Sequence, residues 1–187
     1  MKKQFIYIML MIAFGISLQL AYAQTPSYPT DEELQKLMPD FQRQVEYWNQ
    51  YEEPESQREA RAFAENWSGE PTVALFLGSW AAIEETMDIY PSKTEGQVCI
   101  ITAFSTPNPE VELSLGKVLN QRIYTDAGQV IIQESNYIGI AGKQENETSI
   151  YVYRLMALAQ VPRDLSLSNW HGSDRVIEQF HAAGCIK

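Results

Sequence analysis

The sequence predicts an α+β fold that is mainly β: an antiparallel meander with helices before it and one helix after it. Two observations predict this class. Short runs of alternating apolar and polar residues follow one another between residues 78 and 155, with turns rich in Asn, Asp, Gly and Ser between them. No connection is long and helical enough for the crossover that parallel strands need, so neighbouring strands should pair antiparallel. The pattern leaves open whether the meander is a closed barrel or an open half-barrel.

An export signal is predicted for residues 1–23. A start with two lysines precedes an apolar run from Phe5 to Leu20, and Ala21-Tyr22-Ala23 fits a signal peptidase site. The run is short for a membrane anchor and ends in a cleavage pattern instead of a basic flank. The mature chain is therefore expected to begin at Gln24 and to be periplasmic or extracellular.

The acidic composition limits the partners of the chain. The 187 residues carry a formal net charge of −10, and removal of the signal takes away two lysines and no acids, which brings the charge to −12. Such a chain repels phosphate backbones and anionic membrane surfaces, so neither nucleic acid nor a membrane is expected as a partner of the mature chain. Its length corresponds to one domain.

Residues 24–70 are expected to form a helical lead-in that packs on the sheet. Thr30-Asp31 is a good N-cap, and apolar residues follow at helical spacing up to Trp48. Pro39 lies within this stretch, so the helix is expected either to kink there or to restart with Pro39 in its first turn. A second helical stretch begins at Pro54. Its apolar face consists of Ala60, Phe63, Ala64 and Trp67.

Residues 71–187 are expected to form the meander domain with its C-terminal helix. The first strand is predicted to run unbroken from Gly78-x-Trp80 to Tyr90-Pro91, followed by a turn at 92–96. The second strand, 98–104, is apolar on both faces, which places it in the middle of the sheet or beneath a helix. Later strands are predicted at residues 111–116, 123–124, 130–133, 137–141 and 148–155, which gives six or seven strands in all.

A last helix is predicted over residues 174–183, capped by Ser173 and ended by Gly184. Cys185 follows directly, and in an oxidising compartment an isolated pair such as Cys99 and Cys185 is more often a disulfide than two free thiols. The bridge would close a loop of about 86 residues, worth about 4 to 5 kcal/mol on the chain-entropy account. Two inert buried thiols are the alternative.

Gly78-Ser79-Trp80, preceded by a short apolar turn and followed by an up-and-down meander, resembles the start of the lipocalins and related calycin-type barrels. The resemblance covers residues 71–159. It implies that Trp80 plugs one end of a barrel, that Gly78 lets the backbone pass closely beneath it, and that Arg154 on the last strand stacks its guanidinium on the indole. The strand count and the helical lead-in depart from the family pattern. In the alternative, Trp80 is a core aromatic residue of an open sheet.

Three strand tyrosines are candidate ligand contacts: Tyr137, Tyr151 and Tyr153. They could stack on a ligand, although tyrosine is also ordinary strand composition. Glu84 and Asp88 share one face of the first strand, and Glu85 interrupts the apolar face opposite. Nothing supplies the opposing carboxyl of an acid–base pair, so these acids are interpreted as solvated charges.

No catalytic, cofactor-binding or metal-binding residue is predicted. His171 and His181 lack the spacing of metal ligands and are expected at the surface. No serine lies in a nucleophile elbow, and no Gly-rich loop leads from a strand into a helix.

The predicted function is that of an exported, non-enzymatic small domain that binds a small apolar ligand or a protein partner. The alternatives are a secreted inhibitor or interaction module with a fully packed core, and a hydrolase whose site the sequence does not reveal. The filling of the core distinguishes a ligand-binding protein from an inhibitor or interaction module, because a binding barrel needs space at one end. The side chains expected inside are large and favour a packed interior. They are Ile83, Met87, Ile89, Val98, Ile100, Phe104, Leu113 and Leu115.

Overall fold

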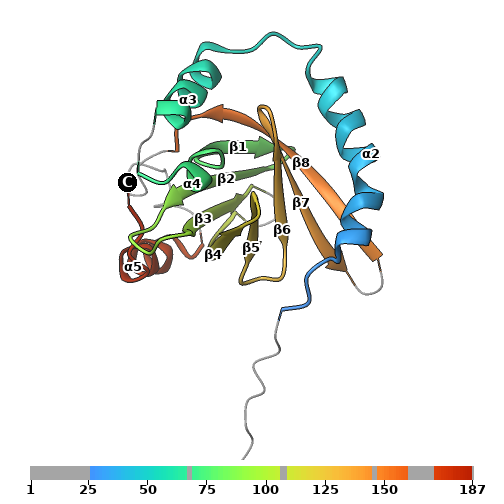
Figure 1. Ribbon diagram of the computed structural model, residues 1–187. Helices are drawn as coiled ribbons and strands as arrows, with labels where there is room; N and C mark the ends of the chain where they lie inside the picture. The colour runs from blue at the N-terminus through green and yellow to red at the C-terminus, as the bar shows by residue number, and fades with distance from the viewer. Residues whose placement is uncertain (1–25, 67–68, 106–108, 145–146, 160–170, 187) are drawn as a thin grey trace, which may run out of the picture.

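The computed structural model of the chain describes residues 26–66, 69–105, 109–144, 147–159 and 171–186. The export signal predicted for residues 1–23 lies outside these ranges. The described chain forms one β-barrel with helices on its outer surface (Figure 1).

Eight antiparallel strands form a closed barrel in which every strand pairs with the next along the chain and β8 pairs back to β1. The predicted meander is therefore confirmed. The strand count of six or seven was too low, and the sheet is closed. The strands are β1 (Gly78–Ala82), β2 (Glu85–Pro91), β3 (Gln97–Phe104), β4 (Glu110–Leu119), β5 (Arg122–Thr125), β6 (Val130–Glu134), β7 (Tyr137–Gln144) and β8 (Glu147–Ala157).

The missing strand arises from a tight turn within residues 78–91, which were predicted to form a single strand. Ile83 and Glu84 make this turn, and Ala82 pairs with Glu85 across it. Glu84 adopts the left-handed backbone conformation, with a φ of 63°. The side chain of Ile83 is 83% exposed at the tip, so the prediction that it faces inward was wrong. Neither residue is a typical turn former, and the alternating pattern runs through the turn without interruption.

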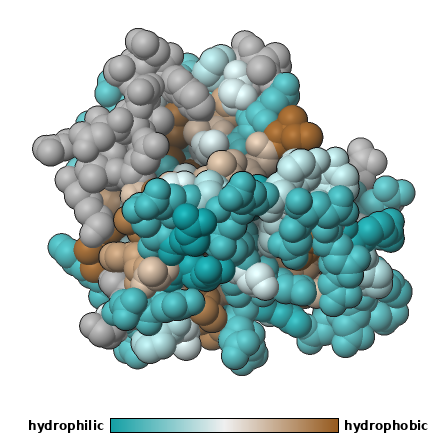
Figure 2. Space-filling view, turned by 90° about the horizontal axis from the view of Figure 1, so that it is seen from above, coloured by the Kyte–Doolittle hydropathy of each residue, from teal (hydrophilic) through white to brown (hydrophobic). Residues whose placement is uncertain are grey.

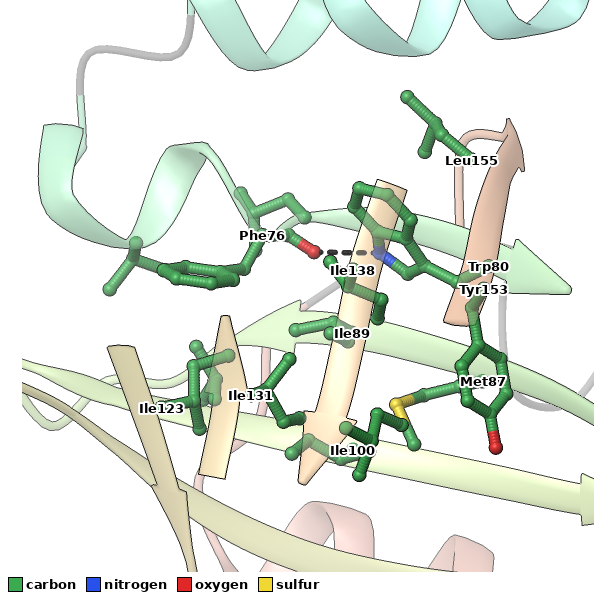
Figure 3. Close-up of a cluster of buried hydrophobic side chains, with 14 of the residues drawn as sticks. Phe76, Trp80, Met87, Ile89, Ile100, Ile123, Ile131, Ile138, Tyr153 and Leu155 are labelled. Atoms are coloured by element: carbon green, nitrogen blue, oxygen red, sulfur yellow. Dashed lines mark hydrogen bonds between the residues drawn. The ribbon is translucent and has the colours of Figure 1, made fainter. Parts of the chain in front are cut away.

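Large side chains from all sides fill one half of the barrel (Figure 3). Met87, Ile89, Val98 and Ile100 are each at most 3% exposed and lie in this core, as predicted. Residues two apart on a strand share a face, which places these four on the inner side of β2 and β3. The half of the barrel that contains Trp80 is thus filled with side chains.

The helix α5 (Ser173–Ala182) covers the outer face of β3 and β4. Leu113 and Leu115 pack there, against the cluster that contains Phe180, so the prediction that they face inward was wrong. The predicted disulfide is confirmed: Cys99 and Cys185 are bridged, with 5.9 Å between their Cα atoms. The covering helix explains why β3 is apolar on both faces, since its inner face lies in the barrel core.

The helix α2 (Asp31–Trp48) lies across the outer face of β5 to β8. It begins with a capping box between Thr30 and Glu33, and it continues through Pro39 without a restart. Phe41 is fully buried against the sheet, where Gly139 leaves it room: a Cβ on Gly139 would lie 3.1 Å from the Phe41 ring.

Two shorter helices complete the lead-in. The helix α3 (Glu55–Asn66) lies over β8 and buries Gln57 and Ala60. Phe63 is 45% exposed, so its predicted place on the packed face was wrong, and Trp67 lies outside the described residues. The helix α4 (Pro71–Ala74) is the single turn that leads into the barrel.

Candidate ligand-binding site

The end of the barrel next to α4 is closed by Phe76 and Trp80. The indole Nε1 of Trp80 donates a hydrogen bond to the Phe76 carbonyl oxygen at 2.9 Å, and Trp80 is 1% exposed (Figure 3). Gly78 has a φ of 143°, and a Cβ there would lie 2.6 Å from Leu155 Cδ1. The positive φ favours glycine at this position, whereas the indole Nε1 would lie 3.8 Å from such a Cβ, an ordinary contact. Trp80 therefore has the buried place at one barrel end that the lipocalin resemblance implied.

The other end of the barrel holds a cavity of about 680 Å³. It lies where β2 begins, where β3 and β7 end, and where β8 begins, so its walls come from strands on opposite sides of the barrel. The lining combines aromatic, aliphatic and polar side chains. It includes Glu85, Phe104, Gln129, Ile140, Lys143, Ser149, Tyr151 and Tyr153. The solid core below this level limits a ligand to the outer half of the barrel.

The hydrogen-bonded pairing that closes the barrel is incomplete along the seam between β1 and β8. The strand β8 pairs with β7 at eight positions but with β1 at only three, from Ser79 to Ala81. Beyond Ala81 the two strands separate, and a second cavity of about 590 Å³ lies there beneath α2. It is lined mainly by apolar side chains, including Trp48, Ile83, Ile150, Val152 and Met156. Figure 2, viewed from the side of the α2–α3 connection, shows apolar side chains reaching an otherwise largely hydrophilic surface.

Three residues line both cavities: Glu85, Tyr151 and Tyr153. The cavity at the open end and the groove beneath α2 therefore adjoin at these side chains. A ligand that enters the open end meets a carboxylate and two phenol rings at the junction. From there its apolar part can extend along either surface. We refer to this junction with its two cavities as the mouth site.

The carboxyl of Glu85 is half-buried beside the Tyr153 ring. Burial raises the pKa of Glu85, and a hydrogen bond from Tyr153 opposes that rise. The pKa of the Tyr153 hydroxyl is also raised, first by burial and then by the Glu85 carboxylate. Tyr153 therefore stays protonated near neutral pH and donates to Glu85.

The basic side chains that line the two cavities, Lys143 and Arg154, make contacts with residues other than Glu85. Lys143, which lines the open-end cavity, has its Nζ 3.0 Å from Glu33 on α2. Arg154, which lines the groove, donates to the Glu52 carbonyl oxygen at 3.1 Å and to Gln57 Oε1 at 3.2 Å. No ion pair to Glu85 is present in the part of the chain that the structure describes.

The predicted stacking of Arg154 on Trp80 does not form. Trp80 pairs with Leu155 across the β1–β8 seam, and Leu155 shares its inward side. The adjacent residue on a strand faces the opposite way, so Arg154 projects outward to the helical lead-in. The end of the barrel is plugged without the cation–π contact that the resemblance implied.

Two of the three candidate tyrosines belong to the mouth site. Tyr151 and Tyr153 line it, whereas Tyr137 is buried on the outer face of β7 beneath α2. The alternation of residues along the strands could not show which tyrosines face the cavity, because α2 also buries the outer face of β7.

Phe104 was predicted to face inward, which its place in the lining agrees with, but neither Phe104 nor Ser149 was predicted as a ligand contact, and Glu85 was interpreted as a solvated charge. The one available signal was Glu85, which interrupts an otherwise apolar strand face. A half-buried carboxyl at such a position points to a cavity or a partner. Ser149 carries no comparable signal.

Asp88 lies away from the mouth site and is only 5% exposed, so its interpretation as a solvated charge was wrong. Burial raises the pKa of Asp88 to about 6, against hydrogen bonds from Ser79 and Tyr90. Its Oδ1 has no hydrogen-bond partner among the described residues. His171 and His181 are exposed, as predicted.

The chain matches no family model, no curated protein and no solved structure with which it was compared. In the described ranges, no group of three His, Cys, Asp or Glu side chains could hold a metal ion. None of the described helices is long and apolar enough to cross a membrane. The fold itself defines the class: a closed eight-stranded antiparallel barrel, with an architecture compatible with that of the lipocalins.

Proposed function

We propose that this chain is an exported, non-enzymatic binding protein of the lipocalin-like type, which takes a small ligand with an apolar body in its mouth site. One observation carries the proposal: the barrel is plugged at the α4 end and hollow at the other, where the cavity of about 680 Å³ adjoins an apolar groove. Small-ligand sites in proteins are concave, mostly apolar and equipped with a few polar groups. The proposal of export rests on the pattern of residues 1–23 and on a disulfide typical of oxidising compartments.

The filled half of the barrel sets the depth of binding. Met87 and Ile100 are 3% and 1% exposed below the cavity, so a ligand does not reach Trp80. The ligand body instead packs against Phe104, Ile140 and Tyr151 or passes through the seam to the groove beneath α2. A compact or short-chain molecule suits this space better than a long one that must penetrate the core.

A dye titration tests the proposal. N-phenylnaphthylamine is neutral at pH 7 and fluoresces in apolar surroundings, and it should bind the protein saturably with one site. Ser149→Trp places an indole in the open-end cavity and should weaken binding at least roughly tenfold, or about 1.4 kcal/mol. Leu119→Trp is the matched control, since Leu119 is exposed at the closed end and should leave binding unchanged.

A further variant distinguishes dye binding in the open-end cavity from dye binding in the groove. Met156→Glu introduces a charge into the groove beneath α2 and leaves the open-end cavity intact. Loss of binding with this variant but not with Ser149→Trp would place the dye in the groove alone. Absence of saturable binding to the unmodified protein would contradict the proposal.

The second candidate, a secreted inhibitor or interaction module, is favoured by one specific observation. The inner half of the barrel is packed solid, and large apolar side chains such as Ile83 and Met156 are exposed beside the groove. A protein partner could use that surface without any ligand in the barrel. The titration distinguishes the two candidates, because an interaction module binds no small dye in its open end.

A further inference from the structure

We propose that the mouth site selects ligands that carry a protonated amine, with the ammonium group held between the Glu85 carboxylate and the surrounding aromatic rings. The inference rests on the proposed function and specifies the chemistry of its ligand. It comes from the position of one acidic side chain at the junction of the two cavities.

Glu85 is the acid that both cavities share, and no cation in the described part of the chain pairs with it. A half-buried carboxylate without a cationic partner is unfavourable, and burial raises its pKa accordingly. Tyr153 donates one hydrogen bond to it, and a carboxylate can accept several more. A ligand ammonium would supply both the missing hydrogen bonds and the compensating charge.

Aromatic rings stand around this carboxylate. Tyr151 and Tyr153 on β8 line the same open-end cavity, as does Phe104 on β3, which pairs directly with Glu85 on β2. The faces of such rings attract cations, and the attraction grows when the cation is shielded from water. Rings of this kind also provide apolar surface for the carbon atoms next to the amine.

The remaining charges do not favour an anionic ligand. Lys143, the cation that lines the open-end cavity, is already paired with Glu33, and Arg154, which lines the groove, donates hydrogen bonds to Glu52 and Gln57. The chain as a whole has a formal charge of −10, which attracts cations and repels anions at a distance. An anionic head group in the open-end cavity would meet the Glu85 carboxylate, and Lys143, which lines this cavity, is already paired with Glu33.

Three probes of similar shape test the inference by isothermal titration calorimetry: phenethylamine, phenethyl alcohol and hydrocinnamate. At pH 7 they carry a positive, a neutral and a negative head group on the same aromatic body. The unmodified protein should bind the amine roughly tenfold or more tightly than the alcohol, and hydrocinnamate most weakly.

Glu85→Gln should remove the preference for the amine and leave binding of the alcohol nearly unchanged. The substitution relieves a buried charge, so the variant is expected to fold at least as stably, which thermal unfolding verifies. Glu84→Gln removes the same charge from the adjacent exposed position and should keep the preference. Equal binding of amine and alcohol to the unmodified protein, or a preference that survives Glu85→Gln, would overturn the inference. If the amine preference fails but the dye still binds in the mouth site, the proposed function stands without this inference. If the dye does not bind either, the proposed function and the inference are both contradicted.

Discussion

The indole of Trp80 is buried at the closed end of the barrel, with its Nε1 bonded to the Phe76 carbonyl oxygen. Trp80→Ala should lower the free energy of unfolding by about 3 to 5 kcal/mol, because it removes a large aromatic side chain and leaves a cavity. Arg154→Ala should cost less, through the hydrogen bonds to Glu52 and Gln57.

The two substitutions should be additive within about 0.5 kcal/mol in a double-mutant cycle, since the side chains lie on opposite faces of the barrel wall. Urea unfolding measures the free energy of unfolding of the unmodified protein, the two single variants and the double variant. Arg154→Ala combined with Gln57→Ala is the positive control, because that pair is in contact at 3.2 Å. Strong coupling between Trp80 and Arg154 would contradict the observed orientation of Arg154.

Asp88 should make the stability of the protein depend on pH. Its pKa in the folded protein is about 6, above the ordinary value of 3.8, so the folded state holds the proton more tightly than the unfolded state. Stability is therefore highest with Asp88 protonated and falls as the pH rises from about 4 through about 6.

Asp88→Asn should abolish that contribution and stabilise the protein at pH 7 by up to about 3 kcal/mol, the equivalent of the pKa difference. The difference between variant and unmodified protein should shrink towards pH 4. Denaturant unfolding at several pH values measures it. A constant difference across this range would show that Asp88 does not titrate in this window.

At the scale of elements, the bridge between Cys99 and Cys185 joins β3 to the end of α5. It links residues 86 positions apart, and Val176 and Phe180 of α5 are fully buried beneath it. Replacement of both cysteines by alanine should reduce the free energy of unfolding by about 4 kcal/mol, chiefly through the entropy of the unfolded chain.

Hydrogen exchange locates the effect of the missing bridge. Amides of α5 should lose protection before those of α2, which is held by its own contacts to β7 and β8. A variant as stable as the unmodified protein, with α5 equally protected, would contradict a stabilising role for the bridge.

The elements with strong local signals were predictable from the sequence. The cap at Thr30, the turn at residues 92–96 and the apolar β3 all appear where the pattern placed them. The turn at Ile83 and Glu84 was missed because neither residue is a typical turn former. Leu113 and Leu115 were assigned to the wrong face because α5 buries the outer face of β4, and alternation does not distinguish two buried faces.

Barrel closure and the mouth site depend on contacts between distant residues. Closure requires β1 to pair with β8, more than 70 positions later, and the local pattern carries no record of that pairing. The pairing of β1 with β8 ends at Ala81, and the gap beyond it leaves Glu85, Tyr151 and Tyr153 lining both cavities. The sequence identified the two tyrosines as candidates and marked Glu85 only as an interruption. Their convergence could not be predicted without the register of the barrel.

The molecule as a whole is divided along the barrel axis. One half is solid and plugged by Trp80, and the other half is hollow with a side opening at the seam, while α2 and α5 cover the outer face of the barrel. A rigid base beneath an open end is the arrangement that positions a ligand without requiring the core to move. The proposed function depends on this division more than on any single residue.

The most direct test of that account is an NMR titration of the isotope-labelled protein with phenethylamine, read by intermolecular nuclear Overhauser contacts. The account predicts contacts from the ligand ring to the side chains of Phe104, Tyr151 and Tyr153, and saturable shifts at Glu85. Residues beneath α5, such as Val176, should show neither. Contacts confined to the outer surface, or shifts that never saturate, would contradict a ligand site in the open end of the barrel.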